Sequence, residues 1–338
     1  MATRPRDQER NGPGEIMDSG NIAEIRSLTA RATRLADRIM LCPPKIRISK
    51  GLPKPMLLTG VGCRNKEIAT VPVRYILQPE VAFWCCELVR SADSYLDTRN
   101  PRMKMPHDSF WLEWPSEDAT SRHSFGALVN SGPDGRSGEI HSWWASEGAL
   151  PDLNVLSVEF DLDAPMARAA NGRSAFAVRN AALPQLDDLL SHVIARLDPG
   201  WEEFLARCGR EKFPQLIQEC MDNTWYLLPQ ILAFVAVLES RTPLTFLSSD
   251  LSRLNKARQR RGKLPLLEHS EIGLDLARGS ILSGEHGGSA QTRQTPRLHH
   301  VRGHLVHRGE TTFWRAPHLR GDIALGVVKR TVTVRRSA

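Results

Sequence analysis

A stretch near the C-terminus, residues 296–322, gathers side chains that could bind a metal ion, a phosphate or a carboxylate. It reads PRLHHVRGHLVHRGETTFWRAPHLRGD and holds five of the chain's 11 histidines together with five arginines. Imidazole nitrogens are ligands for zinc, whereas guanidinium groups bind phosphates and carboxylates through paired hydrogen bonds. The chemistry open to this stretch depends on whether it forms a helix or a strand.

On a helix, His300, His304 and His307 would share one face, because they are spaced three and four residues apart, and they could bind zinc together. Val301 and Gly303, however, are poor helix residues, and no cysteine lies nearby to complete a tetrahedral site. We therefore favour a strand and predict no metal ion and no other cofactor. Gly303 is predicted to be structural, allowing a close approach of the backbone.

On a strand, side chains alternate between two faces, which places His300, Arg302, His304 and Arg308 in one row. Such a row of planar donors suits the phosphates of a nucleic acid or the carboxylates of a protein partner. Trp314 adds an aromatic face for a nucleic-acid base, or else it packs the strand onto the body. The predicted nucleic-acid or partner-binding residues of this stretch are His299, His300, Arg302, His304, His307, Arg308, Trp314, Arg315, His318 and Arg320.

The histidines also allow a catalytic interpretation, in which two of them flank an arginine as general acid and base of a metal-independent ribonuclease. No acidic residue is placed to orient either ring. Motifs of zinc proteases, of α/β-hydrolases and of phosphate-binding loops do not occur in the sequence. We therefore predict no catalytic residue and keep the ribonuclease as an alternative.

The formal net charge of the chain is +7, and the positive charge is concentrated near the C-terminus. Residues 291–338 contain ten Lys and Arg side chains against two acidic ones, which leaves the remainder nearly neutral. A second basic cluster, in LNKARQRRGKLP, adds Lys256, Arg258, Arg260 and Arg261 to the predicted binding residues. A basic region on a near-neutral body favours an anionic partner such as RNA, DNA or an acidic protein surface. The alternative is a solvated basic face that aids solubility.

The sequence also bears on the compartment of the protein. Its first residues lack the apolar stretch of a secretory signal, and the most apolar segment, residues 225–238, is too short to span a membrane and is expected to be a buried helix. The six cysteines show no zinc-binding or redox-pair spacing and are expected to be reduced thiols. We predict a cytoplasmic protein without membrane contact.

Hydrophobic periodicity predicts an α+β fold, with a helical body, a small central antiparallel sheet and a basic C-terminal β-ribbon. The predicted divisions are a disordered N-terminus (1–18), an α+β body (19–282), a linker or long loop (283–296) and a basic His-rich β-type module (297–338). Helices are predicted at 21–40, 81–96, 183–197, 200–209, 213–240 and 248–262. Strands are predicted at 109–114, 123–130, 139–146 and 154–163, with a hairpin turn at SGPDGRSG and a loop over the proline-rich 42–62.

The C-terminal stretch resembles a signature of the type V-A anti-CRISPR family, whose members suppress an effector nuclease during its synthesis. The signature here comprises LHHVRGHLV, a glycine-containing turn and then FWRAPHLRG. The segments FWLEWP and WYLLPQILAFVAVLESRTPLTFLSSDLSRLNKARQRRGKLP are also similar to the family, so the likeness covers residues 108–322. The family commonly has an aromatic residue where this chain has Leu305.

This resemblance implies a cytoplasmic phage or plasmid protein that helps its element to evade host defence. Its partners would be the nascent polypeptide of a defence protein, a CRISPR effector nuclease by resemblance, and RNA or the ribosome. Its action would bring about loss of the target's mRNA. The matching positions are His300, Arg302, Gly303, His304, Trp314 and Arg315. A nucleic-acid-binding regulator is a further alternative, although we find no helix-turn-helix in the sequence.

Overall fold

The structure is a computed structural model of the 338-residue chain. It describes residues 16–17, 34–48, 56–91, 96–117, 122–166, 175–208, 214–239, 244–274, 297–301, 304–308, 311–315, 318–320 and 322–327. The chain divides into two compact units, the first made of Met1–Ala236 and Phe246–Ile272 and the second of Val237–Thr245 and Gly273–Ala338.

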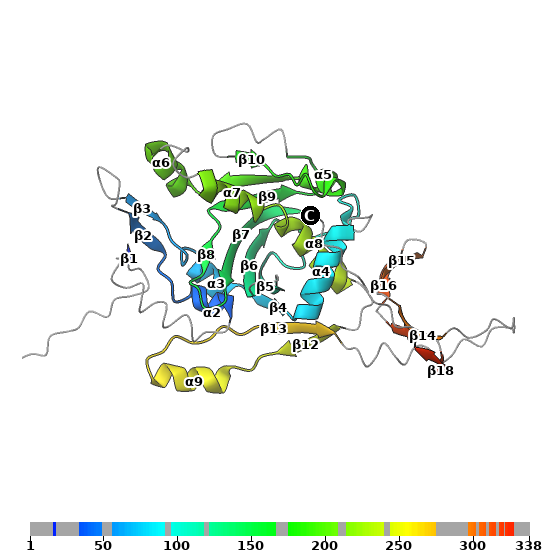
Figure 1. Cartoon of the computed structure of the whole chain (residues 1–338). Helices are drawn as coiled ribbons and strands as arrows, with labels where there is room; N and C mark the ends of the chain where they lie inside the picture. Colours follow the sequence, from blue (N-terminus) through cyan, green and yellow to red (C-terminus); the bar gives the residue numbers. More distant parts are fainter. Residues whose placement is uncertain are drawn as a thin grey trace, which may run out of the picture. The chain divides into compact units, whose positions relative to one another are not determined.

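A ten-stranded mixed sheet is the main feature of the fold (Figure 1). Its strands are β4 (Val73–Leu77), β5 (Ser109–Glu117), β6 (Arg122–Ser131), β7 (Ser137–Ser146), β8 (Asp152–Leu153), β9 (Leu156–Asp161), β10 (Ala175–Ala177), β11 (Val193–Leu197), β12 (Leu244–Ser248) and β13 (Ser270–Leu274). The order across the sheet is β10-β11-β9-β7-β6-β5-β4-β13-β12, with β8 paired to β7. Pairing is antiparallel from β10 to β5 and parallel from β5 through β4 to β13.

Nine helices and a second small sheet are described in addition to the large sheet. The helices are α2 (Leu35–Ile39), α3 (Asn65–Thr70), α4 (Pro79–Ser91), η3 (Pro184–Leu186), α5 (Asp187–Leu190), α6 (Pro199–Cys208), α7 (Pro214–Asp222), α8 (Leu227–Glu239) and α9 (Ser252–Arg260). The small sheet has the order β1 (Ile16–Met17), β2 (Lys45–Ile48) and β3 (Met56–Thr59). None of the helices in the described ranges is long and apolar enough to cross a membrane.

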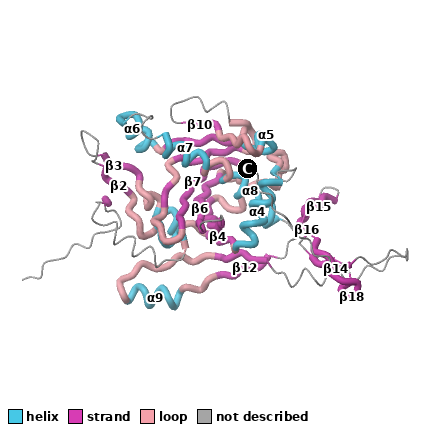
Figure 2. Tube along the Cα trace, in the orientation of Figure 1, coloured by secondary structure: helices cyan, strands magenta, loops and turns pink. Residues whose placement is uncertain are grey.

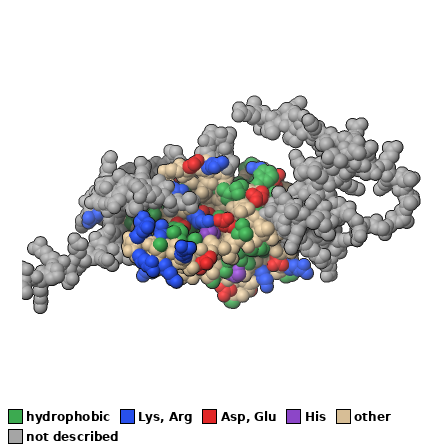
Figure 3. All heavy atoms as spheres, turned by 90° about the horizontal axis from the view of Figure 1, so that it is seen from below, with side chains coloured by type: hydrophobic (Ala, Val, Ile, Leu, Met, Phe, Trp, Pro, Cys, Tyr) green, Lys and Arg blue, Asp and Glu red, His purple; other side chains and the backbone are tan. Residues whose placement is uncertain are grey.

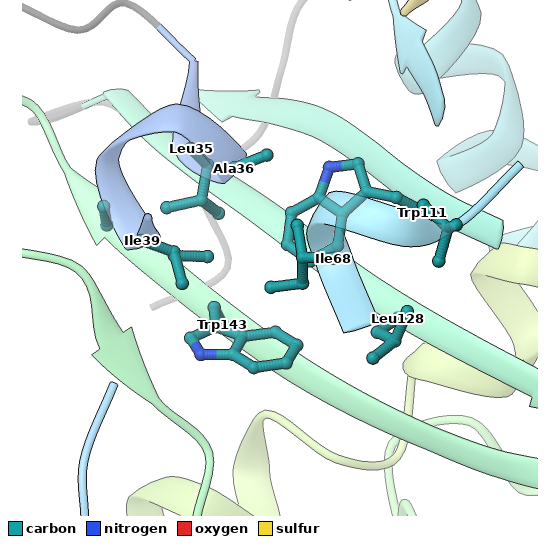
Figure 4. Close-up of a cluster of buried hydrophobic side chains, with 9 residues drawn as sticks. Leu35, Ala36, Ile39, Ile68, Trp111, Leu128 and Trp143 are labelled. Atoms are coloured by element: carbon teal, nitrogen blue, oxygen red, sulfur yellow. The ribbon is translucent and has the colours of Figure 1, made fainter. Parts of the chain in front are cut away.

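The central strand β5 is buried on both faces, because side chains alternate along a strand and helices cover each side. Helices α4 and α8 cover one face of the sheet (Figure 1). Phe110 belongs to this face, since Tyr75 contacts both Phe110 and Phe234 of α8, the latter with ring centroids 5.3 Å apart, and Trp114 shares the face by alternation along β5. Trp111 belongs to the opposite face. There it packs with residues of α2, α3 and the neighbouring strands (Figure 4).

Gly126 in β6 leaves the space that the Trp111 ring occupies. A Cβ atom at this position would lie within 2.6 Å of Trp111 Cη2. The ring is fully buried and its Nε1 donates to Glu113, so it cannot swing away easily. Gly126→Ala should therefore lower the free energy of unfolding by about 1–3 kcal/mol, in line with other overpacked cores.

Urea or thermal unfolding of the Gly126→Ala variant would measure this effect. Gly132→Ala is the matched control, because its added Cβ meets chiefly the Ser137 hydroxyl, at 3.0 Å, near the β6–β7 turn. Equal stability of the two variants would contradict the role assigned to Gly126.

Several predicted elements are confirmed. The four central strands appear as β5, β6, β7 and β9, and the hairpin turn between β6 and β7 contains Gly135 at a φ of 71°. Helices α4, α6 and α9 lie where they were predicted, and α8 is a buried helix within the apolar segment. The predicted helix at 213–240 is split into α7 and α8, and only residues 35–39 of the predicted N-terminal helix lie in a described helix.

The mixed α and β class is confirmed, and the four predicted central strands pair antiparallel with one another. The sheet that contains them is not small and purely antiparallel, because it has ten strands and mixed pairing. The second half of the predicted helix at 183–197 is strand β11, whose Val193 and Ile194 are buried between β9 and β10. The predicted loop at 42–62 contains β2 and β3, and β4, β12 and β13 were missed. Strands β4 and β13 pair with each other although they are far apart in the sequence, so local periodicity does not reveal this pairing, whereas β2 and β3 pair with each other as neighbours in the chain.

The second unit contains the short strands β14 (Arg297–Val301), β15 (His304–Arg308), β16 (Thr311–Arg315), β17 (His318–Arg320) and β18 (Asp322–Val327). Strands β15 and β16 pair antiparallel, and β14 pairs with β17 and β18. The basic C-terminal ribbon and the helical body as a whole are not confirmed. The predicted linker at 283–296 lies outside the described residues, as does the predicted disordered N-terminus except for β1.

Candidate functional site

A pocket of about 720 Å³ opens in the first unit between two segments that are far apart in the sequence. Residues 34–41, in and around α2, form one side, and residues 247–271 form the other. The second segment is an arm that leaves β12, forms α9 and returns through a loop to β13 (Figure 2). Both the walls and the floor of the pocket therefore depend on how α2 and this arm are held.

Helix α2 is held by a carboxylate of the central sheet. Glu113 is only 5 % exposed, and its two oxygens accept hydrogen bonds from Leu35 N at 2.8 Å and Ala36 N at 3.2 Å. These N–H groups lie in the first turn of the helix and have no partner within it. Burial raises the pKa of Glu113, while the hydrogen bonds from Leu35, Ala36 and Trp111 oppose that shift. Glu113 thus fixes the helix that carries Asp37.

The arm is held by hydrogen bonds between α9 and the loop that follows it. Asn255 forms a pair of bonds with the backbone of Leu266, donating to its oxygen at 2.9 Å and accepting from its nitrogen at 2.7 Å. Arg258 Nε donates to Leu264 O at 2.8 Å, and Gly262 ends the helix at a φ of 66°. These bonds keep α9 in place although none of its residues is buried.

Four charged or titratable side chains form what we call the floor of the pocket, namely Arg34, Asp37, His269 and Glu271. Arg34 Nη2 lies 2.6 Å from Glu271 Oε1, and this hydrogen bond lowers the pKa of Glu271. Asp37 is buried and accepts a hydrogen bond from Leu267 N at 2.9 Å. Burial raises the pKa of Asp37, although the Leu267 bond and the nearby Arg34 partly offset the rise.

His269 presents a neutral imidazole to this floor. Its side chain is 4 % exposed, and burial lowers its pKa. Its Nδ1 lies 3.0 Å from Leu267 O, which can only accept, so Nδ1 carries the proton. The second ring nitrogen, Nε2, is consequently an acceptor, and it lies 3.7 Å from Glu271 Oε1.

Ser249 lies beside this histidine without forming a nucleophilic pair with it. Its Oγ is 3.1 Å from His269 Nδ1, but the same Oγ donates to His269 O and accepts from His269 N. Since Nδ1 is already protonated, it cannot remove the proton of the hydroxyl. The serine joins the two strands of the arm, and the pocket is better suited to binding than to acyl transfer.

Two buried atoms of the floor lack a partner in the part of the chain that the structure describes. They are Arg34 Nη1, a donor, and His269 Nε2, an acceptor. A buried polar atom without a hydrogen bond is unfavourable by about 1–3 kcal/mol. A ligand that offers both an acceptor and a donor would satisfy these two atoms.

The rim of the pocket beside α9 is strongly basic. Residues 252–263 carry six Lys and Arg side chains and no acidic one. Five of these are exposed, and the sixth, Arg258, lines the pocket. Figure 3 shows Lys and Arg side chains gathered over one end of the visible face. Leu247 and Leu264, also lining the pocket, are about half exposed.

The structure locates the predicted binding residues in two separate groups. Lys256, Arg258 and Arg260 are on α9 and Arg261 directly follows it, so this predicted cluster is brought together. The others lie on strands whose side chains are not described, namely His299 and His300 on β14, His304, His307 and Arg308 on β15, Trp314 and Arg315 on β16, and His318 and Arg320 on β17.

Backbone register gives the neighbours of some of these residues. His304 pairs with Arg315, and His299 pairs with Arg320. Arg302 and Gly303 lie outside the described residues, so their roles remain predictions. Within the described part, no group of three His, Cys, Asp or Glu side chains could hold a metal ion.

The four floor residues, Arg34, Asp37, His269 and Glu271, were missed by sequence analysis. Arg34 and Glu271 are 237 residues apart, and nothing in either local sequence announces the other. Only the basic character of the neighbouring LNKARQRRGKLP indicated that this part of the chain is functional. Arg253 belongs to the same basic surface and extends the predicted set, whereas Lys263 already lies in the basic cluster recognised from the sequence.

The fold and the site define a mixed α/β protein in which a basic arm borders a partly charged pocket. Comparisons of the chain with protein-family models, with curated proteins and with solved structures returned no match.

Proposed function

We propose that this chain is an anti-defence protein of a mobile element, which binds a nascent polypeptide and promotes loss of its mRNA by contacting RNA or the ribosome. The observation that carries the proposal is the exposed basic arm. Helix α9 has no buried residue, and five of the six cations in residues 252–263 are exposed, so these five do not serve the packing of the core. A dense, exposed positive surface of this kind is typical of proteins that bind the phosphate backbone of nucleic acids.

The resemblance of residues 108–322 to the type V-A anti-CRISPR family supplies the co-translational part of the proposal. That resemblance includes the arm, since LNKARQRRGKLP lies within it. In this function the arm and the basic C-terminal segment contact RNA or ribosome, while the body recognises the polypeptide. Exposed apolar side chains on β12, Phe246 at 53 % and Leu247 at 57 %, offer such a polypeptide an apolar surface.

An affinity pull-down from translating cells tests the proposal. The tagged full-length protein is recovered from lysates with and without nuclease treatment, and both protein and RNA are identified. We expect one preferred polypeptide together with its own message, with the message lost and the polypeptide retained after treatment. The Arg302→Ala/Arg315→Ala variant should recover less RNA and the same polypeptide.

Other outcomes would replace the proposal. Recovery of nucleic acid without a preferred polypeptide would favour a nucleic-acid-binding regulator. Shortening of pure RNA by the isolated protein, abolished by His300→Ala or His304→Ala, would favour the metal-independent ribonuclease. Recovery of neither RNA nor a preferred polypeptide would contradict all three functions.

A further inference from the structure

Three polar groups of the pocket floor lie close together. Glu271 Oε1 is 2.6 Å from Arg34 Nη2 and 3.7 Å from His269 Nε2, so the carboxylate is a neighbour of both the guanidinium and the imidazole. The floor thus offers one donor group and two acceptor groups. Gln78 also hydrogen-bonds to Glu271, but a carboxylate has about four acceptor positions and retains capacity.

We propose that this pocket binds an unpaired guanine base of single-stranded RNA. The Watson–Crick edge of guanine presents O6, N1–H and the N2 amino group, which is the order acceptor, donor, donor. O6 would accept from Arg34 Nη1, N1–H would donate to Glu271, and the N2 amino group would donate to His269 Nε2. The inference rests on the RNA contact of the proposed function and names what that contact recognises.

The other bases fit these three groups less well. Adenine and cytosine place an amino group where Arg34 requires an acceptor. Uracil offers O4 to Arg34 and N3–H to Glu271, but its O2 would then face the His269 acceptor. Only guanine satisfies both atoms that lack partners, Arg34 Nη1 and His269 Nε2, and recognition of unpaired bases through this edge is common in RNA-binding proteins.

The surroundings of the floor also favour a nucleotide. Leu251, Leu264 and Pro265 supply apolar walls for the faces of a base, and the volume of about 720 Å³ is within the usual range of small-ligand pockets. Arg258 and Lys263 line the pocket as well, and the other cations of α9 are exposed on the same helix as Arg258. An arginine side chain of a peptide would match the two acceptors, but these cations would repel it.

The experiment measures the affinity of the full-length protein for short fluorescent oligouridines by anisotropy. One oligonucleotide carries a single central guanosine, and the others carry adenosine, uridine or inosine at that position. We expect guanosine to be preferred by about tenfold over adenosine and uridine, as for one good base-specific contact. Inosine lacks the N2 amino group, so it should bind several-fold more weakly, and this comparison needs no protein variant.

Glu271→Gln should abolish the preference for guanosine over the other bases, because the amide nitrogen of the glutamine would face the N1–H donor of guanine. It keeps an oxygen for Arg34 and changes only one acceptor. The matched control is Glu67→Gln, which alters the partly exposed Arg64–Glu67 pair at α3, with an N–O distance of 2.8 Å against 2.6 Å for Arg34–Glu271. Thermal unfolding of both variants checks that each is folded.

The outcomes separate this inference from the proposed function. RNA binding with no base preference, or a preference that survives Glu271→Gln, would overturn the guanine site and leave the RNA contact standing. Tight binding of an arginine-containing peptide that displaces no RNA would assign the pocket to a protein partner instead. Absence of RNA binding altogether would overturn the guanine site together with the RNA contact of the proposed function.

Discussion

Glu113→Ala should lower the free energy of unfolding by about 2–4 kcal/mol, which corresponds to a fall in Tm of roughly 5–10 °C. The substitution removes the only acceptors that the structure shows for Leu35 N, Ala36 N and Trp111 Nε1, three buried donors. Each unsatisfied donor is unfavourable by about 1–3 kcal/mol, and relief from burying the carboxylate offsets part of the total. Thermal and urea unfolding measure the effect.

The same substitution should disturb the pocket, because α2 has five residues and is too short to be stable without tertiary contacts. Arg34 and Asp37 would lose their positions, and any preference for guanosine should fall. Glu67→Ala is the control, since its side chain is partly exposed and should change stability by less than about 0.5 kcal/mol. A Glu113→Ala protein as stable as this control would show that α2 is anchored in another way.

Replacing Lys256, Arg260 and Arg261 with alanine should weaken RNA binding by tenfold to a hundredfold, as an order-of-magnitude estimate, at physiological salt. All three side chains are exposed, so the substitutions remove charge without opening the core. Each phosphate contact with a single strand contributes about 0.7 to the slope of log affinity against log salt concentration. The slope should therefore fall by about two, which a salt titration by anisotropy would measure.

A charge-matched control distinguishes a specific RNA contact of α9 from a general effect of net charge on RNA affinity. Lys66, Arg90 and Arg102 are exposed cations of the first unit outside the arm. Their joint replacement with alanine removes the same charge and should leave the salt slope unchanged. If both triple variants lose affinity equally, the effect is one of overall charge and α9 has no special contact with RNA.

The elements predicted well from the sequence are those whose stability is local. Residue types alternate within each of the segments FWLEW, HSFGALVN and EIHSWWAS. The turn between the last two segments contains the glycines that are typical of hairpin turns. The helix at 252–260 is followed by Gly262, which ends it, and at its start Ser252 N donates a hydrogen bond to Asp250 Oδ1. Side-chain periodicity and turn chemistry act over a few residues, so these segments are visible in the sequence.

Elements that depend on distant partners were missed or misread. Strand β11 follows a short helix and has a pattern compatible with either structure, and its pairing with β9 and β10 decides in favour of a strand. Strand β4 is in the sheet because it pairs in parallel with β5 and β13, and β13 lies almost 200 residues later in the chain. Local propensity is weaker than such pairing and burial.

What the sequence by itself determined is the mixed class of the fold, the central strands, the buried helix α8 and the clustering of cations at 256–261. Only the tertiary structure decided that Glu113 holds α2 and that Arg34, Glu271 and His269 meet on the floor of one pocket. The physical reason is distance along the chain. Periodicity reports which face of an element is buried, whereas a binding site requires polar groups from separate elements to converge, and that convergence depends on the packing of the whole unit.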